Sequence, residues 1–372
     1  MDIESRLDGA VGRALAERRI VGAVVLVRKH GALVYEKAHG LADREAGQPM
    51  RAETIFRLSS VTKPLVATTI LALIDAGAME LDAPVTSYLP DFKPRLADGT
   101  VPTITIRHLL THTSGLPVMA ILSAEEQAAG VNRWRLGDAE IIRRYGAQQL
   151  LFAPGTGWQY GPSIDVLGYI AGRLVGGRLE DALRKYVTGP LGMADTGFAV
   201  PDRARLAAAY ADGADGPDLM GDPHTIPNYW GGTTTYDPNR IFDAEAFQAG
   251  GGGAAGTGPD IMTLLETLRT GGGEVLKPHT AALGLSNQTP QLEQTAGPGW
   301  KFSLFGAWLD DPQAARVQHN RGTNRWAGIY GHHWFIDPDE GLTVVCMSNT
   351  GLEGSDGQLR EDVRDAVYGE PA

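Results

Sequence analysis

The residues best suited to chemistry are a serine and a lysine three positions apart, Ser60 and Lys63. Apolar residues recur at helical spacing over 65–74, which predicts a helix to about Gly77 with both side chains on one face. A lysine amine can accept the serine proton, and the positive end of a helix dipole stabilises the resulting alkoxide. Pro64 fits the first turn of such a helix, where a backbone N–H has no partner. The spacing therefore indicates a nucleophilic serine, although a capping serine followed by a solvated lysine produces this pattern more often.

Length and charge limit the classes of protein to consider. A chain of 372 residues exceeds the roughly 250–300 residues at which a single core stops growing, so two lobes are expected. The net charge of -11, without basic clusters, argues against nucleic acid or an anionic membrane as partner and favours a small-molecule substrate. The N-terminal segment lacks the apolar core of a signal peptide, and no long apolar run occurs. We therefore expect a cytoplasmic protein without a membrane span.

The elements that must position Ser60 come from both ends of the chain. Alternating and continuous apolar patterns predict strands, and 3.6-residue periodicity predicts helices. Strands are expected at 22–29, 32–38, 301–309, 331–337 and 342–348, and helices at 3–18, 106–110, 138–149, 163–175, 179–187, 260–269 and 356–367. Strands at both ends around a helical middle indicate an α+β fold with one sheet built from both chain ends.

A proline- and glycine-rich stretch over 81–101 marks the expected boundary between lobes. The prediction is a single unit over 1–372, with an α/β lobe at about 1–80 plus 245–372 and a helical lobe at about 81–244. The region 212–243 has few periodic signals and is longer than most loops without a function. We expect it to be loop-like and to form a pocket wall.

Several other patterns do not indicate a cofactor. Residues 251–256 match G-x-G-x-x-G, but no apolar strand precedes them, so their small size more simply lets the backbone pass close to a neighbour. His332 and His333 point to opposite faces of a strand and cannot hold one metal together, so one is expected to pack and the other to border the site. His112 is expected to be a hydrogen-bonded structural residue rather than a base. Cys346, the single cysteine, lies in an apolar strand pattern and is expected to be buried and unreactive.

Two further segments strengthen the interpretation of Ser60 as a catalytic nucleophile. A Pro-Gly turn at 154–155 leads to Tyr160 just before a helix, and Arg325-Trp326-Ala327-Gly328 lies in the C-terminal strand region. The three segments, in this order, resemble the motifs of class C β-lactamases and related penicillin-recognising hydrolases. The chain is most similar to the carboxylesterase branch, the family VIII esterases, over nearly its whole length; residues 41–47, 109–115 and 330–335 also resemble that branch.

The resemblance implies a β-lactamase-like fold, in which helices cover an antiparallel sheet and the site lies between the sheet and a helical lobe. It implies Ser60 as nucleophile, with Lys63 and Tyr160 as the pair that handles its proton. The backbone N–H groups of Ser60 and Ile329 would form the oxyanion hole. Trp326 and Gly328, on the third motif, would contact substrate.

Two departures from the family pattern bear on specificity. Pro162 stands where the lactamases carry the asparagine of Tyr-x-Asn, and Trp326 stands where they carry a lysine that attracts a substrate carboxylate. Both changes favour neutral, short-chain esters over anionic lactams. The resemblance therefore implies a serine carboxylesterase that forms an acyl-enzyme on Ser60 without metal or cofactor. The alternatives are a β-lactamase, transacylase or amide hydrolase on the same scaffold, or a silent ligand-binding protein, which would have no need of Ser60, Lys63 and Tyr160 together.

Overall fold

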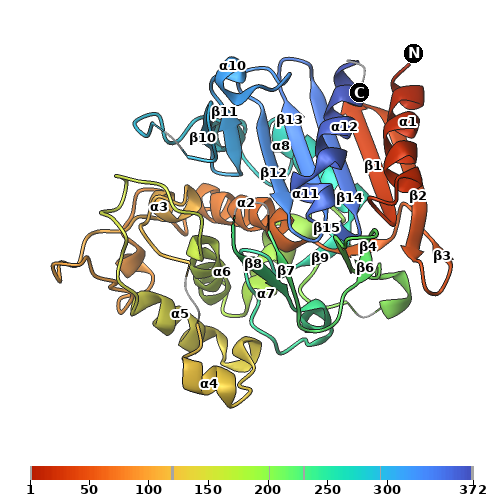
Figure 1. Ribbon diagram of the computed structural model, residues 1–372. Helices are drawn as coiled ribbons and strands as arrows, with labels where there is room; N and C mark the ends of the chain where they lie inside the picture. Colours follow the sequence, from red (N-terminus) through yellow and green to blue (C-terminus); the bar gives the residue numbers. More distant parts are fainter. Residues whose placement is uncertain (1, 119–120, 201, 229–230, 294, 370–372) are drawn as a thin grey trace.

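The computed structural model describes residues 2–118, 121–200, 202–228, 231–293 and 295–369 and is built on one eight-stranded sheet. Its strand order is β10-β11-β12-β13-β14-β1-β2-β3, with every neighbouring pair antiparallel (Figure 1). The strands are β1 (Gly22–Lys29), β2 (Ala32–Asp43), β3 (Gln48–Pro49), β10 (Trp300–Phe302), β11 (Ala307–Leu309), β12 (Asn324–Gly328), β13 (His332–Asp337) and β14 (Leu342–Ser348). Because β1 pairs with β14, one sheet joins the two chain ends, as predicted.

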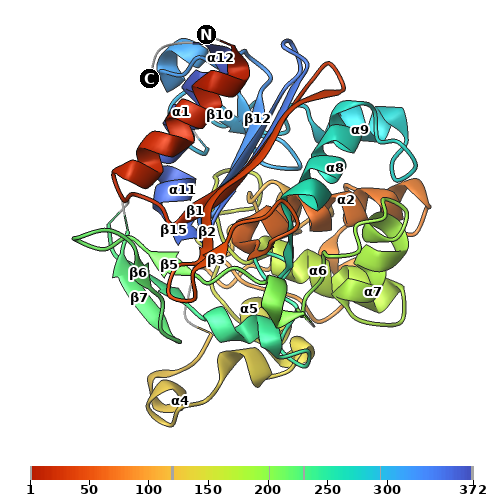
Figure 2. The same cartoon turned by 90° about the vertical axis from the view of Figure 1, so that its right-hand side faces the viewer.

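Helices cover both faces of the sheet. Figure 2 shows α1 (Ile3–Ala16), α11 (Glu353–Asp356) and α12 (Gln358–Tyr368) on one side and α2 (Thr62–Asp75), α8 (Gly258–Arg269) and α9 (Pro278–Gly284) on the other. Successive strand residues therefore enter different cores: Val25 and Cys346 pack with α1 and α12, whereas Val24 and Met347 pack toward α2 and α8. Cys346 is fully buried, as predicted, and burial raises the pKa of its thiol to about 12; its expected lack of reactivity stays a prediction.

The middle of the chain forms short helices. These are α3 (Ile106–Leu110), α4 (Ala124–Ala128), α5 (Asp138–Gly146), α6 (Ser163–Leu174) and α7 (Leu179–Leu183). Of these, α6 and α7 contact α2, so the helix that follows Tyr160 packs against the helix that follows Ser60. The division of the chain at about residues 80 and 245 stays a prediction. Among the described helices, none has both the length and the apolarity needed to span a membrane.

The expected strand over 301–309 was wrong, because the chain reverses within it. Backbone N–H groups of Phe305 and Gly306 each donate to Ser303 Oγ at 3.1 Å, which closes a turn between β10 and β11. Leu304 and Phe305 lie in the apolar core although they form this turn. Apart from Ser303 and Gly306 the turn is apolar, so its sequence pattern resembles a continuous strand.

Three other elements differ from expectation at their ends or in kind. Strand β2 continues to Asp43, mostly through exposed or half-buried residues that give no apolar alternation. The region 212–243 is not simply loop-like: within the described residues it contains a hairpin of β7 (His224–Pro227) and β8 (Thr233–Tyr236). The final helix predicted at 356–367 corresponds to α12, and the short helix α11 precedes it on the other side of Gly357.

Shorter strands complete the fold. β4 (Ile55–Arg57) pairs with β9 (Ala255–Thr257) directly before Ser60, and a small sheet joins β15, β5 and β6. These last strands are β5 (Tyr210–Ala211), β6 (Asp218–Leu219) and β15 (Thr350–Gly351), and α10 (Pro312–Ala315) precedes β12.

Candidate active site

Ser60 lies in a single 3-10 turn, Ser59–Val61, that runs directly into α2. Ser59 has a φ of 48°, a left-handed conformation that is uncommon for a residue other than glycine, so the chain turns sharply just before Ser60. Pro64 occupies the first turn of α2, as predicted. The turn therefore holds the Ser60 hydroxyl at the N-terminal end of a buried helix.

The structure brings Ser60, Lys63 and Tyr160 together. Lys63 Nζ donates to Ser60 Oγ at 3.0 Å, and the Tyr160 hydroxyl lies 2.7 Å from the same oxygen. Lys63 Nζ also lies 4.5 Å from the centroid of the Tyr160 ring. Lys63 is 7% exposed, so its amine is largely removed from water. Both groups that could take the serine proton thus touch the oxygen that carries it.

Asp165 is a residue of this site that the sequence analysis did not single out. Lys63 Nζ donates to the carbonyl oxygen of Gly251, and the N–H of Gly251 donates to Asp165 Oδ1 at 2.7 Å. A Cβ added to Gly251 would lie 3.1 Å from Asp165 Oδ1 and 3.6 Å from Lys63 Nζ, so the glycine lets both groups approach the same point. Burial raises the pKa of Asp165, while the Gly251 N–H and the charge of Lys63 oppose that rise. The sequence feature that could have identified Asp165 is a single carboxyl group in the mostly apolar first turns of α6.

Aromatic rings surround Tyr160. The His112 ring centroid lies 4.8 Å from that of Tyr160, and the Trp326 ring centroid lies 5.2 Å from it. His112 Nδ1 accepts a hydrogen bond from the Gly161 N–H at 3.4 Å. Burial, and then the charge of Lys63, keep the pKa of His112 well below its usual value. A neutral His112 packed on Tyr160 agrees with the expected structural role.

The predicted oxyanion groups line the same cavity. Ser60 and Ile329 both line the cavity described below, and within the described residues no hydrogen bond uses the backbone N–H of either. The Tyr236 hydroxyl donates to the Ile329 carbonyl oxygen at 3.0 Å and so fixes that peptide. A Cβ at Gly328 would lie 2.5 Å from the Leu58 carbonyl oxygen, so only glycine lets β12 pack this closely on the Ser60 turn. This gives Gly328 a packing role, and its expected contact with substrate stays a prediction.

The adjacent histidines point in different directions, as expected. His332 Nε2 lies 2.9 Å from the Arg57 carbonyl oxygen, whereas His333 Nδ1 lies 2.8 Å from that of Gly354 and His333 lines the cavity. Burial lowers the pKa of each to about 4, so both are neutral at pH 7. Among the described residues, no cluster of three or more His, Cys, Asp or Glu side chains could hold a metal ion.

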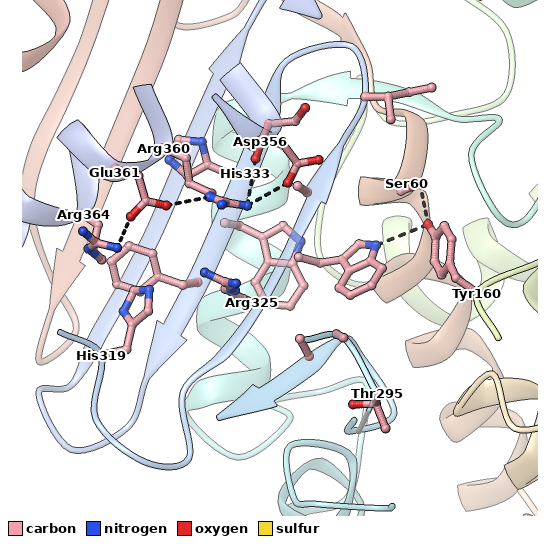
Figure 3. Close-up of a pocket in the computed structure, with 18 of the residues that line it drawn as sticks. Ser60, Tyr160, Thr295, His319, Arg325, His333, Asp356, Arg360, Glu361 and Arg364 are labelled. Carbon is pink, nitrogen blue, oxygen red and sulfur yellow. Dashed lines mark hydrogen bonds and ion pairs between the residues drawn. The ribbon is translucent and has the colours of Figure 1, made fainter. Parts of the chain in front are cut away.

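A cavity of about 650 Å³ opens at Ser60 and Tyr160 (Figure 3). Near Ser60 its walls are mainly apolar and include Trp158 and Trp326. The expected wall from 212–243 lies elsewhere: its described residues line a separate cavity of about 690 Å³ with Trp134 and Arg240. The walls around Ser60 therefore suit an uncharged acyl or alcohol group.

Comparison with known proteins matches the beta-lactamase family over residues 7–368. Esterase EstB of Burkholderia gladioli is 44% identical, over 98% of this chain and 95% of its own. Monacolin J acid methylbutanoyltransferase of Aspergillus terreus is 31% identical, over 92% of this chain and 89% of its own. Among solved structures, EstCE1, described as a hydrolase with promiscuous acyltransferase activity, matches with a TM-score of 0.91 and 39% identity over 98% of both chains.

These matches extend over nearly the whole chain and agree with the antiparallel sheet and its covering helices. The predicted α+β, β-lactamase-like fold is thus confirmed. The chain belongs to the beta-lactamase family, and its similarity to EstB and EstCE1 places it in the esterase branch of that family.

Proposed function

We propose that this protein is a serine carboxylesterase that hydrolyses neutral, short-chain esters through an acyl-enzyme on Ser60. The observation that carries the proposal is the contact of Ser60 Oγ with both Lys63 Nζ and the Tyr160 hydroxyl. A nucleophile whose oxygen touches two proton-handling groups is the arrangement that acyl transfer requires. The names of EstB and EstCE1 support ester hydrolysis as the reaction.

The reaction follows from this geometry in two halves. The Lys63–Tyr160 pair takes the proton from Ser60 as Oγ attacks the ester carbonyl carbon, and the N–H groups of Ser60 and Ile329 donate hydrogen bonds to the oxyanion that forms. Tyr160 then passes the proton to the leaving alcohol, and the ester bond breaks. In the second half, water gives its proton to the same pair and attacks the acyl carbon. Breakdown of the resulting tetrahedral intermediate returns a proton to Ser60 Oγ and releases the carboxylic acid.

The proposed preference for neutral esters rests on what surrounds Ser60. Pro162 caps α6 and offers no side-chain donor, and Trp326 supplies an indole instead of an ammonium. A carboxylate next to the reacting carbonyl would lose its hydration without gaining a cation. The proposed reaction uses no metal or cofactor, and its partner is a small-molecule ester. The cytoplasmic location and the expected lack of nucleic-acid or membrane partners stay predictions.

Transacylation is the second candidate. It is favoured by two relatives: EstCE1 is described as having acyltransferase activity, and the Aspergillus terreus relative is named as a methylbutanoyltransferase. The same acyl-enzyme gives either outcome, because an alcohol bound beside apolar walls competes with water for the acyl group. The measurement is the ratio of transesterified to hydrolysed product as an acceptor alcohol is raised at fixed ester.

The direct test of the proposal is labelling by a fluorophosphonate, which reacts with an activated serine. The expected result is one label per chain on the peptide that contains Ser60, with loss of nitrophenyl acetate hydrolysis in parallel. A Ser60→Ala variant is the matched control. A folded wild-type protein that takes no label and hydrolyses no ester would instead support the silent ligand-binding alternative.

A further inference from the structure

The cavity that begins at Ser60 extends well beyond the space that the reaction needs. Figure 3 shows Ser60 and Tyr160 at one end, Arg325 further along, and His319 and Arg364 at the other end. Pockets of roughly 300–1,000 Å³ hold drug-sized ligands, so the 650 Å³ here exceeds what a short-chain ester fills. We call the part that runs from Arg325 to Arg364 the distal groove.

Arg325 is directed into the distal groove by its place in β12. It pairs across the sheet with Phe335, whose ring packs with α12, whereas the next residue pairs with Trp334 in the other core. Since neighbouring strand residues point to opposite faces, Arg325 points to the face that α12 flanks. Its side chain therefore emerges between β12 and α12.

The guanidinium of Arg325 has no acceptor of its own. It lies 3.8 Å from the centroid of the Trp300 ring, and no described residue forms a hydrogen bond or ion pair with it. Stacking on the indole covers one face of the group and leaves the N–H donors along its edge unused. Burial, with the charge of Arg360, lowers the pKa of Arg325 to about 9. A half-buried cation is thus kept without a carboxylate in hydrogen-bond contact, which is costly unless a ligand supplies one.

The carboxylates of the distal groove are already paired. Asp356 accepts from Arg360 at 2.8 Å, and Glu361 accepts from Arg360 at 3.1 Å and also from Arg364. The two arginines of α12 are therefore neutralised by carboxylates of α11 and α12. Arg325, on β12, is the cation of this groove for which the described residues provide no carboxylate.

We propose that the distal groove is a substrate subsite in which Arg325 binds a carboxylate carried by the ester at the end remote from its scissile bond. This rests on the proposed ester hydrolysis at Ser60 and changes its preferred substrate from a wholly neutral ester to one with a distant charge: the ester group stays among the apolar walls near Ser60, while a carboxylate several bonds away reaches the guanidinium. A planar guanidinium edge matches a carboxylate with two parallel hydrogen bonds. Hemiesters of dicarboxylic acids, or esters of phenols and alcohols that bear a carboxylate, have this chemistry.

The kinetic test compares substrates that differ only in the distal charge. On the acyl side these are mono-4-nitrophenyl adipate and its terminal carboxamide; on the alcohol side they are 4-acetoxybenzoate and 4-acetoxybenzamide. In wild type we expect kcat/KM to favour the carboxylate of one pair by roughly 10–100-fold, mainly through KM. The pair that shows the effect identifies the side of the ester that occupies the groove.

Variants then assign the effect to Arg325. Arg325→Met should bring the carboxylate-to-carboxamide ratio of kcat/KM to about one. Arg325→Gln should have the same effect, although glutamine keeps a polar side chain at this position. Arg325→Lys should keep part of the ratio, because the charge remains but the paired geometry is lost. The matched control is Arg321→Met: Arg321 is exposed, pairs with Asp310 and does not line the groove. It should leave the ratio unchanged.

Calorimetry with adipate on Ser60→Ala separates this proposal from the esterase proposal, since it needs no turnover. Binding of adipate that disappears with Arg325→Met supports the subsite even if no ester is hydrolysed. Ester hydrolysis with no carboxylate preference in either pair and no adipate binding would overturn the subsite and leave the esterase function standing. A preference that survives Arg325→Met in a protein with wild-type thermal unfolding would also overturn it.

Discussion

The indole N–H of Trp326 donates a hydrogen bond of 3.4 Å to the hydroxyl of Tyr160. That hydroxyl lies 2.7 Å from Ser60 Oγ, so the residue at the head of the third motif is two hydrogen bonds from the candidate nucleophile. The lactamases that this motif resembles carry a lysine here. The exchange of an ammonium for an indole therefore changes both the charge presented to substrate and the partner of Tyr160.

Lactam hydrolysis should accordingly be a side activity. The carboxylate of a cephalosporin lies close to its reacting carbonyl and would meet the indole of Trp326, which cannot offset the loss of hydration. We expect kcat/KM for a chromogenic cephalosporin to be well below that for nitrophenyl acetate or butyrate. A wild-type ratio well above one would favour a β-lactamase instead.

The same contact predicts the effect of Trp326→Lys. The new ammonium would lie beside Tyr160, so the cephalosporin-to-ester ratio of kcat/KM should rise, by roughly tenfold for one added charged hydrogen bond. The indole also packs on Phe302, with ring centroids 5.3 Å apart, so some loss of thermal stability is expected. Trp308→Lys is the matched control, because Trp308 lies on β11 and does not line the cavity. If the cephalosporin-to-ester ratio rose equally in both variants, the effect could not be assigned to the contact of residue 326 with Tyr160.

The nucleophile can be assigned by mass. Ser60→Ala should fold and lose ester turnover to near background, and wild type treated with a slow ester should carry the acyl group on Ser60. Ser59→Ala is the matched control and should keep ester turnover; alanine there must adopt the same φ of 48° as Ser59. An adduct found on Ser59 would require the nucleophile to be reassigned.

Substitution of either Tyr160 or Lys63 should lower kcat. General acid–base catalysis contributes typically ~10²–10⁴-fold, so Tyr160→Phe should lower kcat by that order with little change in KM for a neutral ester. Lys63→Ala should lower kcat at least as much. Tyr186→Phe, which does not line the cavity, serves as control. Wild-type kcat in Tyr160→Phe would move the proton shuttle to another group, with His332 and His333 the next residues to test.

The sequence predicted the site better than the elements that carry it. Ser60, Lys63 and Tyr160 are identified by residue type and order, which chemistry constrains tightly. The turn between β10 and β11 is different, because its residues Leu304 and Phe305 are buried and apolar and therefore look like a continuous strand. Its reversal depends on Ser303, whose hydroxyl accepts hydrogen bonds from two backbone N–H groups, and one serine and one glycine among apolar residues were not recognised as a turn signal.

Tertiary contacts explain the rest of what the sequence did not show. Asp165 and Gly251 are 86 positions apart and meet only after α6 has packed on α2. Arg325 was visible in the third motif, but its lack of a partner depends on where the carboxylates of α12 point. Pairings of this kind leave no local pattern, since neither residue type nor spacing records what lies opposite in space.

Asp165→Ala and Asp165→Asn test whether that carboxyl positions Lys63 through Gly251. Asparagine keeps an acceptor for the Gly251 N–H, whereas alanine removes it. We expect Asp165→Ala to lower kcat by roughly tenfold with little change in KM, and Asp165→Asn to recover most of that loss. Asp260→Ala is the control: burial raises the pKa of Asp260 as well, but it pairs with Thr196 and does not line the cavity. Equal losses of kcat in Asp165→Ala and Asp165→Asn would show that the hydrogen bond to Gly251 does not position Lys63.

The two adjacent histidines of β13 should make the protein sensitive to acid. His332 and His333 are 1% and 3% exposed, and burial lowers the pKa of each from 6.5 to about 4. Between those values the unfolded chain binds more protons than the folded one. The contribution of these histidines to the free energy of unfolding should therefore be complete above about pH 6.5. It should fall on acidification, by up to about 1.4 kcal/mol per pH unit for each histidine.

Urea unfolding at pH 7, 6 and 5 measures this slope, and the side chains allow matched replacements. Gln at 332 keeps a donor near the position of Nε2, which faces the Arg57 carbonyl, and Asn at 333 keeps one near Nδ1, which faces that of Gly354. His332→Gln and His333→Asn should each flatten the slope, and the double variant should flatten it further. His279→Gln, at an exposed position, should leave it unchanged. If the slope stayed at its wild-type value in the double variant, the acid sensitivity would have to come from groups other than this pair.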